Sequence, residues 1–282
     1  MAQAPATPKP RRALLRLLAT VAPELAFARA GAPSERAALA RRRAAAGRAL
    51  APAEEVIFLI PLGGPHQVQD WDAVQARPGD TLQSLLRQRG NWRAVICCQQ
   101  RPDLPTDPRI TFLPFDDPTP GNDKWRKLAA LGDHLDRVAR HPAYVMSFDA
   151  DDLLREGTVE HMLIRQDPGY LMEFGYVMDH ATGAVGLAGP RSLRYPMRKP
   201  FWKLCGSCLA LHHDPDLPES QRFLREMTQH EHRMFPYLAS LAGLAPSALP
   251  YPCVLYVLNH GENFGARRGR VGFKTRFVKR FP

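Results

Sequence analysis

Between residues 56 and 148 the sequence alternates short apolar runs with segments of helical periodicity, and this alternation restricts the fold more than any other feature. Apolar runs of strand length occupy residues 56–60, 92–98, 110–115 and 144–148. Helices are predicted over 81–89, with Thr81 as the N-cap, and over 124–139. Strands that alternate with helices pair in parallel, because each helix returns the chain to the same end of the sheet. We therefore predict an α/β domain with a Rossmann-type, mostly parallel sheet flanked by helices.

The chain beyond residue 153 has a less regular pattern. Strand-like runs occupy 170–178, 202–211 and 251–258, and one or two helices around Pro236 are predicted within 221–238. No second strand–helix series follows. We therefore expect a mixed C-terminal portion beside the parallel sheet.

Three carboxylates, Asp149, Asp151 and Asp152, directly follow the apolar run 144–148. Like charges so close together repel one another, and a hard divalent cation with oxygen ligands relieves that repulsion. Ligands of parallel sheets bind at the carboxyl ends of the strands, where these residues would lie. The pattern favours a metal site. A charged turn that caps the next helix is the alternative.

The net charge of +10 is concentrated at the two ends of the chain. Residues 1–50 hold ten Lys and Arg against two acids, and residues 264–282 hold seven against none. Residues 51–263 hold 21 bases and 26 acids. This division predicts a basic, Ala/Arg-rich helical extension over 1–50, a single domain over 51–263 and a basic tail over 264–282. Basic ends of this kind favour contact with an anionic membrane surface.

The N-terminal segment carries apolar residues at helical spacing, namely Leu14, Leu17, Leu18, Val21 and Leu25. Pro23 should bend or restart this helix. Arg16 and Glu24 interrupt the apolar pattern well short of a transmembrane span, so no transmembrane helix is predicted. A helix docked on the domain and an interfacial membrane helix both fit this pattern. We expect a cytoplasmic protein that is peripheral at the inner face of the membrane.

Five cysteines do not pair evenly, and their usage fits a reducing compartment. Cys97, Cys98 and Cys253 lie in apolar runs, as buried thiols do. Cys205 and Cys208 form a CxxC pair, which could be redox-active or half of a zinc site. No second CxxC answers it, so a purely structural role stays open as well.

The run from Tyr144 to Leu153 resembles the DxD region of nucleotide-sugar glycosyltransferases with the GT-A fold, in particular the inverting family-2-like and rhamnosyltransferase-type enzymes. Residues 56–62 are similar to that family's opening strand and loop, and 122–127 to the basic segment before the DxD strand. Residues 206–211 resemble the strand after the acceptor loop. The resemblance spans roughly 56–263, and it implies a GT-A-like sheet with a mixed acceptor-side portion.

The resemblance also implies the site residues. Asp149 would face the ribose and the metal, Asp151 would be the main ligand of Mn²⁺ or Mg²⁺, and His260 would complete the metal site. The implied nucleotide-sugar contacts are Pro61, Leu62, Gly63, Lys124 and Asp149. Lys124 would help to stabilise the diphosphate leaving group. Lys127 is a second candidate for this role. A solvated helix face is the alternative for both lysines, and it is the expected position for Lys127.

An inverting transfer needs a base to deprotonate the acceptor hydroxyl. Glu231 is the candidate, because it lies where inverting members carry an acidic pair. The second acid of that pair is His232 in this sequence, so Glu226 and Glu173 stay open as alternatives.

The implied activity is a metal-dependent, hexosyltransferase-type sugar transfer, with inversion, from a nucleoside-diphosphate sugar to a hydroxyl of a glycan or lipid-linked acceptor, as in polysaccharide biosynthesis. The motifs do not identify the sugar, the nucleotide or the acceptor. Four alternatives remain: a dehalogenase-like phosphatase, a nucleotidyltransferase, a GT-A-shaped domain without activity, and a basic nucleic-acid-binding protein. Because no RRM, KH or zinc-finger signature occurs, we do not expect a nucleic-acid partner.

Overall fold

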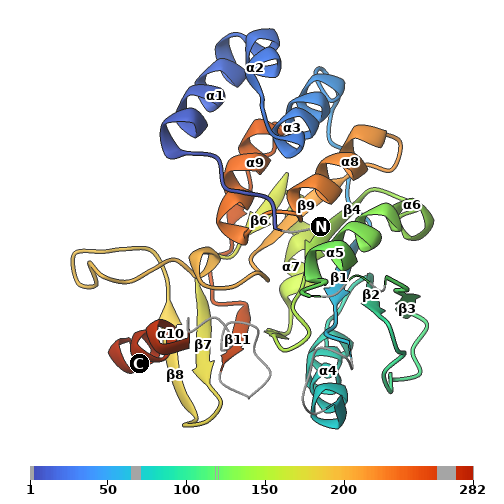
Figure 1. The fold of residues 1–282 in the computed structure, drawn as a ribbon, viewed down its shortest axis with the longest axis vertical. Coiled ribbons are helices and arrows are strands. Elements are labelled where there is room, and N and C mark those ends of the chain that lie inside the picture. The colour runs from blue at the N-terminus through green and yellow to red at the C-terminus, as the bar shows by residue number, and fades with distance from the viewer. Residues whose placement is uncertain (1–2, 65–70, 118, 120, 259–270, 282) are drawn as a thin grey trace.

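The structure is a computed structural model that describes residues 3–64, 71–117, 119, 121–258 and 271–281, with the backbone alone for 71–78 and 271–275. Its strands form a sheet of seven strands and a sheet of four, which lie beside each other in Figure 1. No helix in the described ranges is long and apolar enough to cross a membrane.

The seven-stranded sheet is the mostly parallel sheet that the sequence predicts. In spatial order its strands are β10 (Ser247–Ala248), β6 (Gly169–Leu171), β9 (Leu209–His213), β4 (Ala143–Ser147), β1 (Glu55–Pro61), β2 (Trp92–Cys98) and β3 (Ile110–Pro114). Only β9 among them runs against its neighbours, β4 and β6. The remaining pairs are parallel. The predicted α/β class, with a mostly parallel Rossmann-type sheet, is confirmed.

Strand β1 lies at the point where the strand order reverses. The chain runs from β1 outward through β2 to β3, and then returns to place β4 on the other side of β1. Residues 55–60 are buried throughout, as in a strand covered on both faces. In sheets with such a reversal the two connections leave in opposite directions, and ligands bind beside the carboxyl ends of the strands that flank it, here β1 and β4. The ends of these two strands are Pro61 and Ser147.

The helices of the domain are α4 (Trp71–Leu86), α5 (Lys124–Asp133), α6 (Leu135–Val138), α7 (Thr158–Arg165), α8 (Pro218–Met227) and α9 (Phe235–Leu241), with 3-10 turns η2 (Phe201–Lys203) and η3 (His232–Met234). The prediction for Thr81 was wrong. Helix α4 begins at Trp71, and the buried Thr81 lies inside it rather than at its N-cap. The predicted helix over 124–139 is divided into α5 and α6 at His134.

The N-terminal segment forms α1 (Lys9–Val21), α2 (Pro23–Arg29) and α3 (Pro33–Ala44). The chain restarts at Pro23 as predicted, since proline is well placed in the first turn of a helix. Helix α3 packs on α8 and α9, and α1 on α9. Buried Glu35 accepts hydrogen bonds from Thr7 at 2.6 Å and from Tyr237 at 3.0 Å. Residues 3–44 are therefore tied to the domain, whereas the division at residue 50 stays a prediction.

The four-stranded sheet is the mixed C-terminal portion. Its order is β5 (Leu153–Leu154), β11 (Val254–Leu258), β7 (Gly175–Asp179) and β8 (Ala184–Ala188), and α10 (Val271–Arg280) packs against it. Strand β7 pairs in parallel with β11 and antiparallel with β8.

Two predicted strands are divided in the structure. The run 170–178 forms the end of β6 and most of β7, which belong to different sheets. The ring of Phe201 lies against the start of β7, where a Cβ atom added at Gly175 would come within 2.3 Å of the ring. The run 202–211 forms a strand only from Leu209, because η2 and a loop occupy its first half. Local periodicity could not show this contact between distant segments.

Candidate functional site

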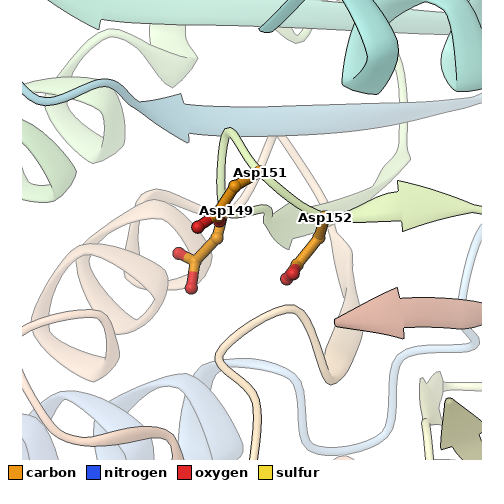
Figure 2. Close-up of side chains that lie close together, drawn as sticks. All are labelled: Asp149, Asp151 and Asp152. Atoms are coloured by element: carbon orange, nitrogen blue, oxygen red, sulfur yellow. The ribbon is translucent and has the colours of Figure 1, made fainter. Parts of the chain in front are cut away.

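Asp149, Asp151 and Asp152 lie at the carboxyl end of β4, at the edge of the sheet where β1 also ends. Their carboxylate oxygens come within 4.8 Å of one another. Figure 2 shows the three side chains projecting toward the same side of the turn. The structure therefore brings together the carboxylates that the sequence indicated as a metal site, at the position where a sheet of this topology binds ligands.

Asp152 is the fully buried member of the three carboxylates. Its Oδ2 accepts a hydrogen bond from Ser207 Oγ at 2.5 Å and one from Cys205 Sγ at 3.0 Å. Its Oδ1 has no hydrogen-bond partner among the described residues. Burial, and then the negative charges of Asp151 and Asp149, raise the pKa of Asp152 well above that of an ordinary aspartate. A cation at this turn would relieve both the repulsion and the unsatisfied oxygen.

The Cys205–Cys208 loop is joined to the aspartate turn by hydrogen bonds. Ser207 Oγ accepts a hydrogen bond from the backbone amide of Asp149 at 2.8 Å while it donates to Asp152. The amide of Ser207 in turn donates to Cys205 Sγ at 3.3 Å. One hydroxyl thus fixes the positions of two carboxylate-bearing residues. Sequence reasoning missed Ser207, although its position between two small-residue neighbours in a CxxC pair was a signal that the loop packs closely.

The two cysteines of this loop are buried thiols. All five cysteines are free and buried. Burial raises the pKa of Cys205 and of Cys208, which keeps both thiols protonated and poorly suited to attack or metal binding. The Cys205 thiol acts as a hydrogen-bond donor to Asp152. The structural role of the CxxC pair is the one that the structure supports.

Lys124 forms an ion pair with Asp149, one of the two partly exposed carboxylates of the aspartate turn. Its Nζ lies 2.6 Å from Asp149 Oδ1, and about a third of its side chain (32%) is exposed. Burial would lower the pKa of the Lys124 ammonium, but the charges of Asp149 and Asp151 outweigh it and raise the pKa. Lys124 is therefore a cation beside the carboxylates that a ligand can reach. This is the position from which it could contact a diphosphate.

The expectation for Lys127 was wrong, because its side chain is buried instead of solvated. It is 1% exposed, and its Nζ lies 2.9 Å from Asp123 Oδ2. The same ammonium donates to the Leu62 carbonyl at 2.6 Å, and Gln99 donates to Asp123 at 2.6 Å. The face of α5 that carries Lys127 lies against the end of the sheet, so this lysine supports the first loop from inside.

Pro61, Leu62 and Gly63 form the end of β1 and the start of that first loop. Pro61 is in register with Cys97 on β2. The Leu62 amide donates to the Cys97 carbonyl at 3.0 Å, which continues the pairing beyond the strand. The three residues therefore lie at the edge of the sheet where β4 also ends, as expected for contacts to a nucleotide. That role stays a prediction.

Helix α4 holds the aspartate turn from another side. The Thr81 hydroxyl donates to the Ala150 carbonyl at 2.9 Å, and the Leu154 amide donates to Ser84 Oγ at 3.0 Å. Tyr256 on β11 also lies within electrostatic range. Burial raises the pKa of Tyr256, and the nearby Cys205 and the aspartates raise that pKa further. Sequence reasoning found neither Thr81 nor Tyr256 as a neighbour of the carboxylates.

Glu231 precedes η3, and a third of its side chain is exposed. Its Oε1 lies 3.6 Å from Arg233 Nε, which also donates to the Lys203 carbonyl at 3.3 Å. Lys203 ends η2, two residues before Cys205. Glu231 is therefore linked through Arg233 to the segment that leads into the Cys205–Cys208 loop.

The alternative bases occupy different surroundings. The Glu173 carbonyl accepts a hydrogen bond from the Phe201 amide at 2.9 Å, so Glu173 lies beside the start of the same segment. Glu226 lies on α8, where it pairs with Arg225 at 2.7 Å. His260 lies outside the described residues. The assignments of Glu231 as base and of His260 as ligand stay predictions.

Comparison with known proteins leaves the family open. No family model matches the sequence, and no curated protein matches it. Among solved structures, a 4-diphosphocytidyl-2C-methyl-D-erythritol synthase shares 12% identity over 80% of this chain and 99% of its own, with a TM-score of 0.33. The glycosyltransferase GlyE of Streptococcus pneumoniae TIGR4 shares 12% identity over 82% of this chain, with a TM-score of 0.35 in its apo form. This chain spans about half (52%) of the GlyE chain.

Proposed function

We propose that the protein is a metal-dependent, inverting glycosyltransferase that moves a hexosyl group from a nucleoside-diphosphate sugar to an acceptor hydroxyl. The observation that carries this proposal is the cluster of Asp149, Asp151 and Asp152 at the carboxyl end of β4, next to Lys124 and to the reversal in strand order. The resemblance of the surrounding motifs to nucleotide-sugar glycosyltransferases supports it.

The carboxylates fit a divalent cation of the Mn²⁺ or Mg²⁺ type. They supply only oxygen ligands, which such hard cations prefer, and the buried Asp152 Oδ1 lacks a hydrogen-bond donor among the described residues. Asp149 and Asp151, which are partly exposed, would hold the ion. When bound, the ion would supply positive charge that stabilises the nucleoside diphosphate as it leaves.

The residues of the chain would divide the remaining tasks. Lys124 would stabilise the negative charge that develops on the diphosphate, since its ammonium is charged and accessible. Pro61, Leu62 and Gly63 would contact the nucleotide through the backbone at the end of β1. Glu231 would take the proton from the acceptor hydroxyl, and inversion follows if that hydroxyl attacks opposite the leaving diphosphate.

The acceptor in this proposal is a glycan or a lipid-linked sugar, as in polysaccharide biosynthesis. The basic ends of the chain favour contact with an anionic membrane, so we propose a cytoplasmic protein peripheral at the inner face of the membrane.

Binding of the donor nucleotide tests the metal and diphosphate part of the proposal. Uridine, guanosine and thymidine diphosphates are titrated calorimetrically into the protein with and without Mn²⁺. We expect at least one to bind in a Mn²⁺-dependent manner, and Asp151→Asn to abolish that binding. Asp216→Asn, which removes an exposed carboxylate on a distant turn, is the matched control. Absence of metal-dependent binding by the wild type would overturn the proposal.

Turnover tests the base. A panel of nucleotide sugars is incubated with the protein and Mn²⁺, and released nucleoside diphosphate is measured. With the active donor, Glu231→Gln should lower turnover by about 10²–10⁴-fold while it leaves donor affinity unchanged. Glu173→Gln is assayed beside it. If only the Glu173 variant loses turnover, the base is Glu173 and the assignment of Glu231 is wrong.

A further inference from the structure

The connection between β8 and η2 contains an ordered loop, residues 189–199, that the proposed chemistry does not use. The Gly189 amide donates to the Lys199 carbonyl at 3.0 Å, which closes the base of the loop. At its tip, the Tyr195 amide donates to the Ser192 carbonyl at 3.1 Å. In Figure 1 the loop projects away from β7 and β8 on the side where α10 lies. Its conformation is therefore held by its own hydrogen bonds.

An aromatic contact joins this loop to the C-terminal end of the described chain. The ring centroids of Tyr195 and Phe281 are 6.4 Å apart, and the Arg198 guanidinium lies 3.9 Å from the Tyr195 ring centroid. Lys279 and Arg280, at the end of α10, are exposed next to Phe281. The loop and the end of α10 thus contribute to one continuous surface.

The loop presents apolar side chains to solvent. Leu193 is fully exposed (104%), and Met197 is 55% exposed. Apolar surface in these positions is in contact with water, and its burial against another surface would be favourable. Both residues lie on a loop with a defined conformation, so their exposure is a property of the fold.

The same loop is strongly basic. Arg191, Arg194, Arg198 and Lys199 lie within it, and no acidic residue occurs between Asp179 and Asp214. Burial lowers the pKa of the Lys199 ammonium. Three neighbouring cations, Arg233, Arg191 and Lys203, lower the same pKa further, which shows how closely positive charges gather here.

We propose that residues 189–199 and the exposed end of α10 dock on an anionic phospholipid membrane, with Leu193 and Met197 inserted between the headgroups. Cations that surround exposed apolar side chains are the combination that binds such an interface. A soluble polyanion would engage the cations but would leave Leu193 and Met197 in water. The chain continues from Lys199 through η2 to Cys205, which contacts Asp152, so docking would bring the aspartate turn close to the membrane surface.

Vesicle sedimentation tests this proposal without any donor, so its outcome is independent of the transfer chemistry. The full chain is mixed with vesicles of phosphatidylcholine alone or of phosphatidylcholine with phosphatidylglycerol. We expect binding to the anionic vesicles only. The double variant Leu193→Ser, Met197→Ser should bind more weakly by at least about tenfold, because it removes two apolar side chains that insertion would bury. The variant Arg191→Gln, Arg194→Gln should lose binding as well.

Control variants separate this surface from other exposed apolar residues. Ile164→Ser removes a side chain that is 73% exposed on α7 and should bind like the wild type. Leu17→Ser, Val21→Ser removes exposed residues of α1. If that variant loses binding while the Leu193, Met197 variant retains it, the membrane contact is made by α1 and the proposal is wrong. Binding to heparin but to neither vesicle would identify a soluble polyanion and overturn it too.

Discussion

Helix α5 carries two lysine–aspartate pairs whose surroundings are opposite. Lys124 Nζ lies 2.6 Å from Asp149 Oδ1, and the two side chains are 32% and 23% exposed. One turn later, Lys127 Nζ lies 2.9 Å from Asp123 Oδ2, and the two side chains are 1% and 2% exposed. The pairs have the same chemistry and similar lengths. They differ in whether either partner can exchange its bond for one to water or to a ligand.

The difference in exposure indicates different roles for the two ion pairs. A buried pair has lost its hydration, and the Leu62 carbonyl and the Gln99 amide supply the missing hydrogen bonds. Such a pair is closed and holds the first loop in place. The Lys124–Asp149 pair is partly exposed, so solvent or a ligand can replace either partner at a lower cost than in the buried pair. In the proposed function Lys124 would therefore be the lysine that binds the diphosphate, while Lys127 holds the backbone of the first loop.

The largest effect is expected for Lys127→Met. This variant leaves Asp123 buried without its cation, so the free energy of unfolding should fall by about 3–5 kcal/mol. Urea denaturation of the wild type and the variant measures it. A loss below about 1 kcal/mol would show that the buried pair does not support the fold, and the comparison would fail.

Lys124→Met should give the opposite result. Turnover of the active nucleotide sugar should fall by about 10²-fold, because a charged donor to the leaving diphosphate is removed. The free energy of unfolding should change by less than about 1 kcal/mol. The two variants thus serve as controls for each other in the same two assays. If both variants lost the same free energy of unfolding, the proposed difference between the partly exposed pair and the buried pair would be wrong.

Ser207→Ala tests whether the Cys205–Cys208 loop positions the carboxylates of the aspartate turn. The Asp152 carboxylate and the Asp149 amide both lose a buried partner, so the free energy of unfolding should fall by about 2 kcal/mol. Affinity for Mn²⁺, measured by calorimetry, should fall by about tenfold, because the ligands are less well oriented. Ser207→Cys keeps a weak donor and should recover part of both losses. No change in either quantity would mean that the loop does not position the carboxylates.

The smallest effect is expected for Thr81→Val. The substitution removes the hydrogen bond to the Ala150 carbonyl and keeps the shape of the side chain. The free energy of unfolding should fall by about 1 kcal/mol. Mn²⁺ affinity should stay close to the wild-type value, since Ser207 still holds the carboxylates. A larger loss of Mn²⁺ affinity than in Ser207→Ala would show that α4, rather than the Cys205–Cys208 loop, orients the site.

Much of the fold could be predicted from local pattern. Strand β2 has the predicted bounds, β3 ends one residue before the predicted run, and β4 begins and ends one residue earlier than predicted. Buried parallel strands are continuous apolar runs, so the sequence alone reveals them. The start of α4 and the division between β6 and β7 could not be predicted in this way. The contact of Phe201 with Gly175 joins residues far apart in the sequence, and no local period encodes it.

The candidate site shows the same limit. That three carboxylates follow a buried strand is evident from the sequence alone, because the apolar run and the aspartates are adjacent along the chain. The burial of Lys127, the partial exposure of Lys124 and the hydrogen bonds of Ser207 to the aspartate turn depend on how distant segments pack in the fold. Periodicity shows which face of an element is apolar. The side chains and loops that meet a charged group come from distant segments, and these determine whether its charge is neutralised inside the protein or left for a ligand.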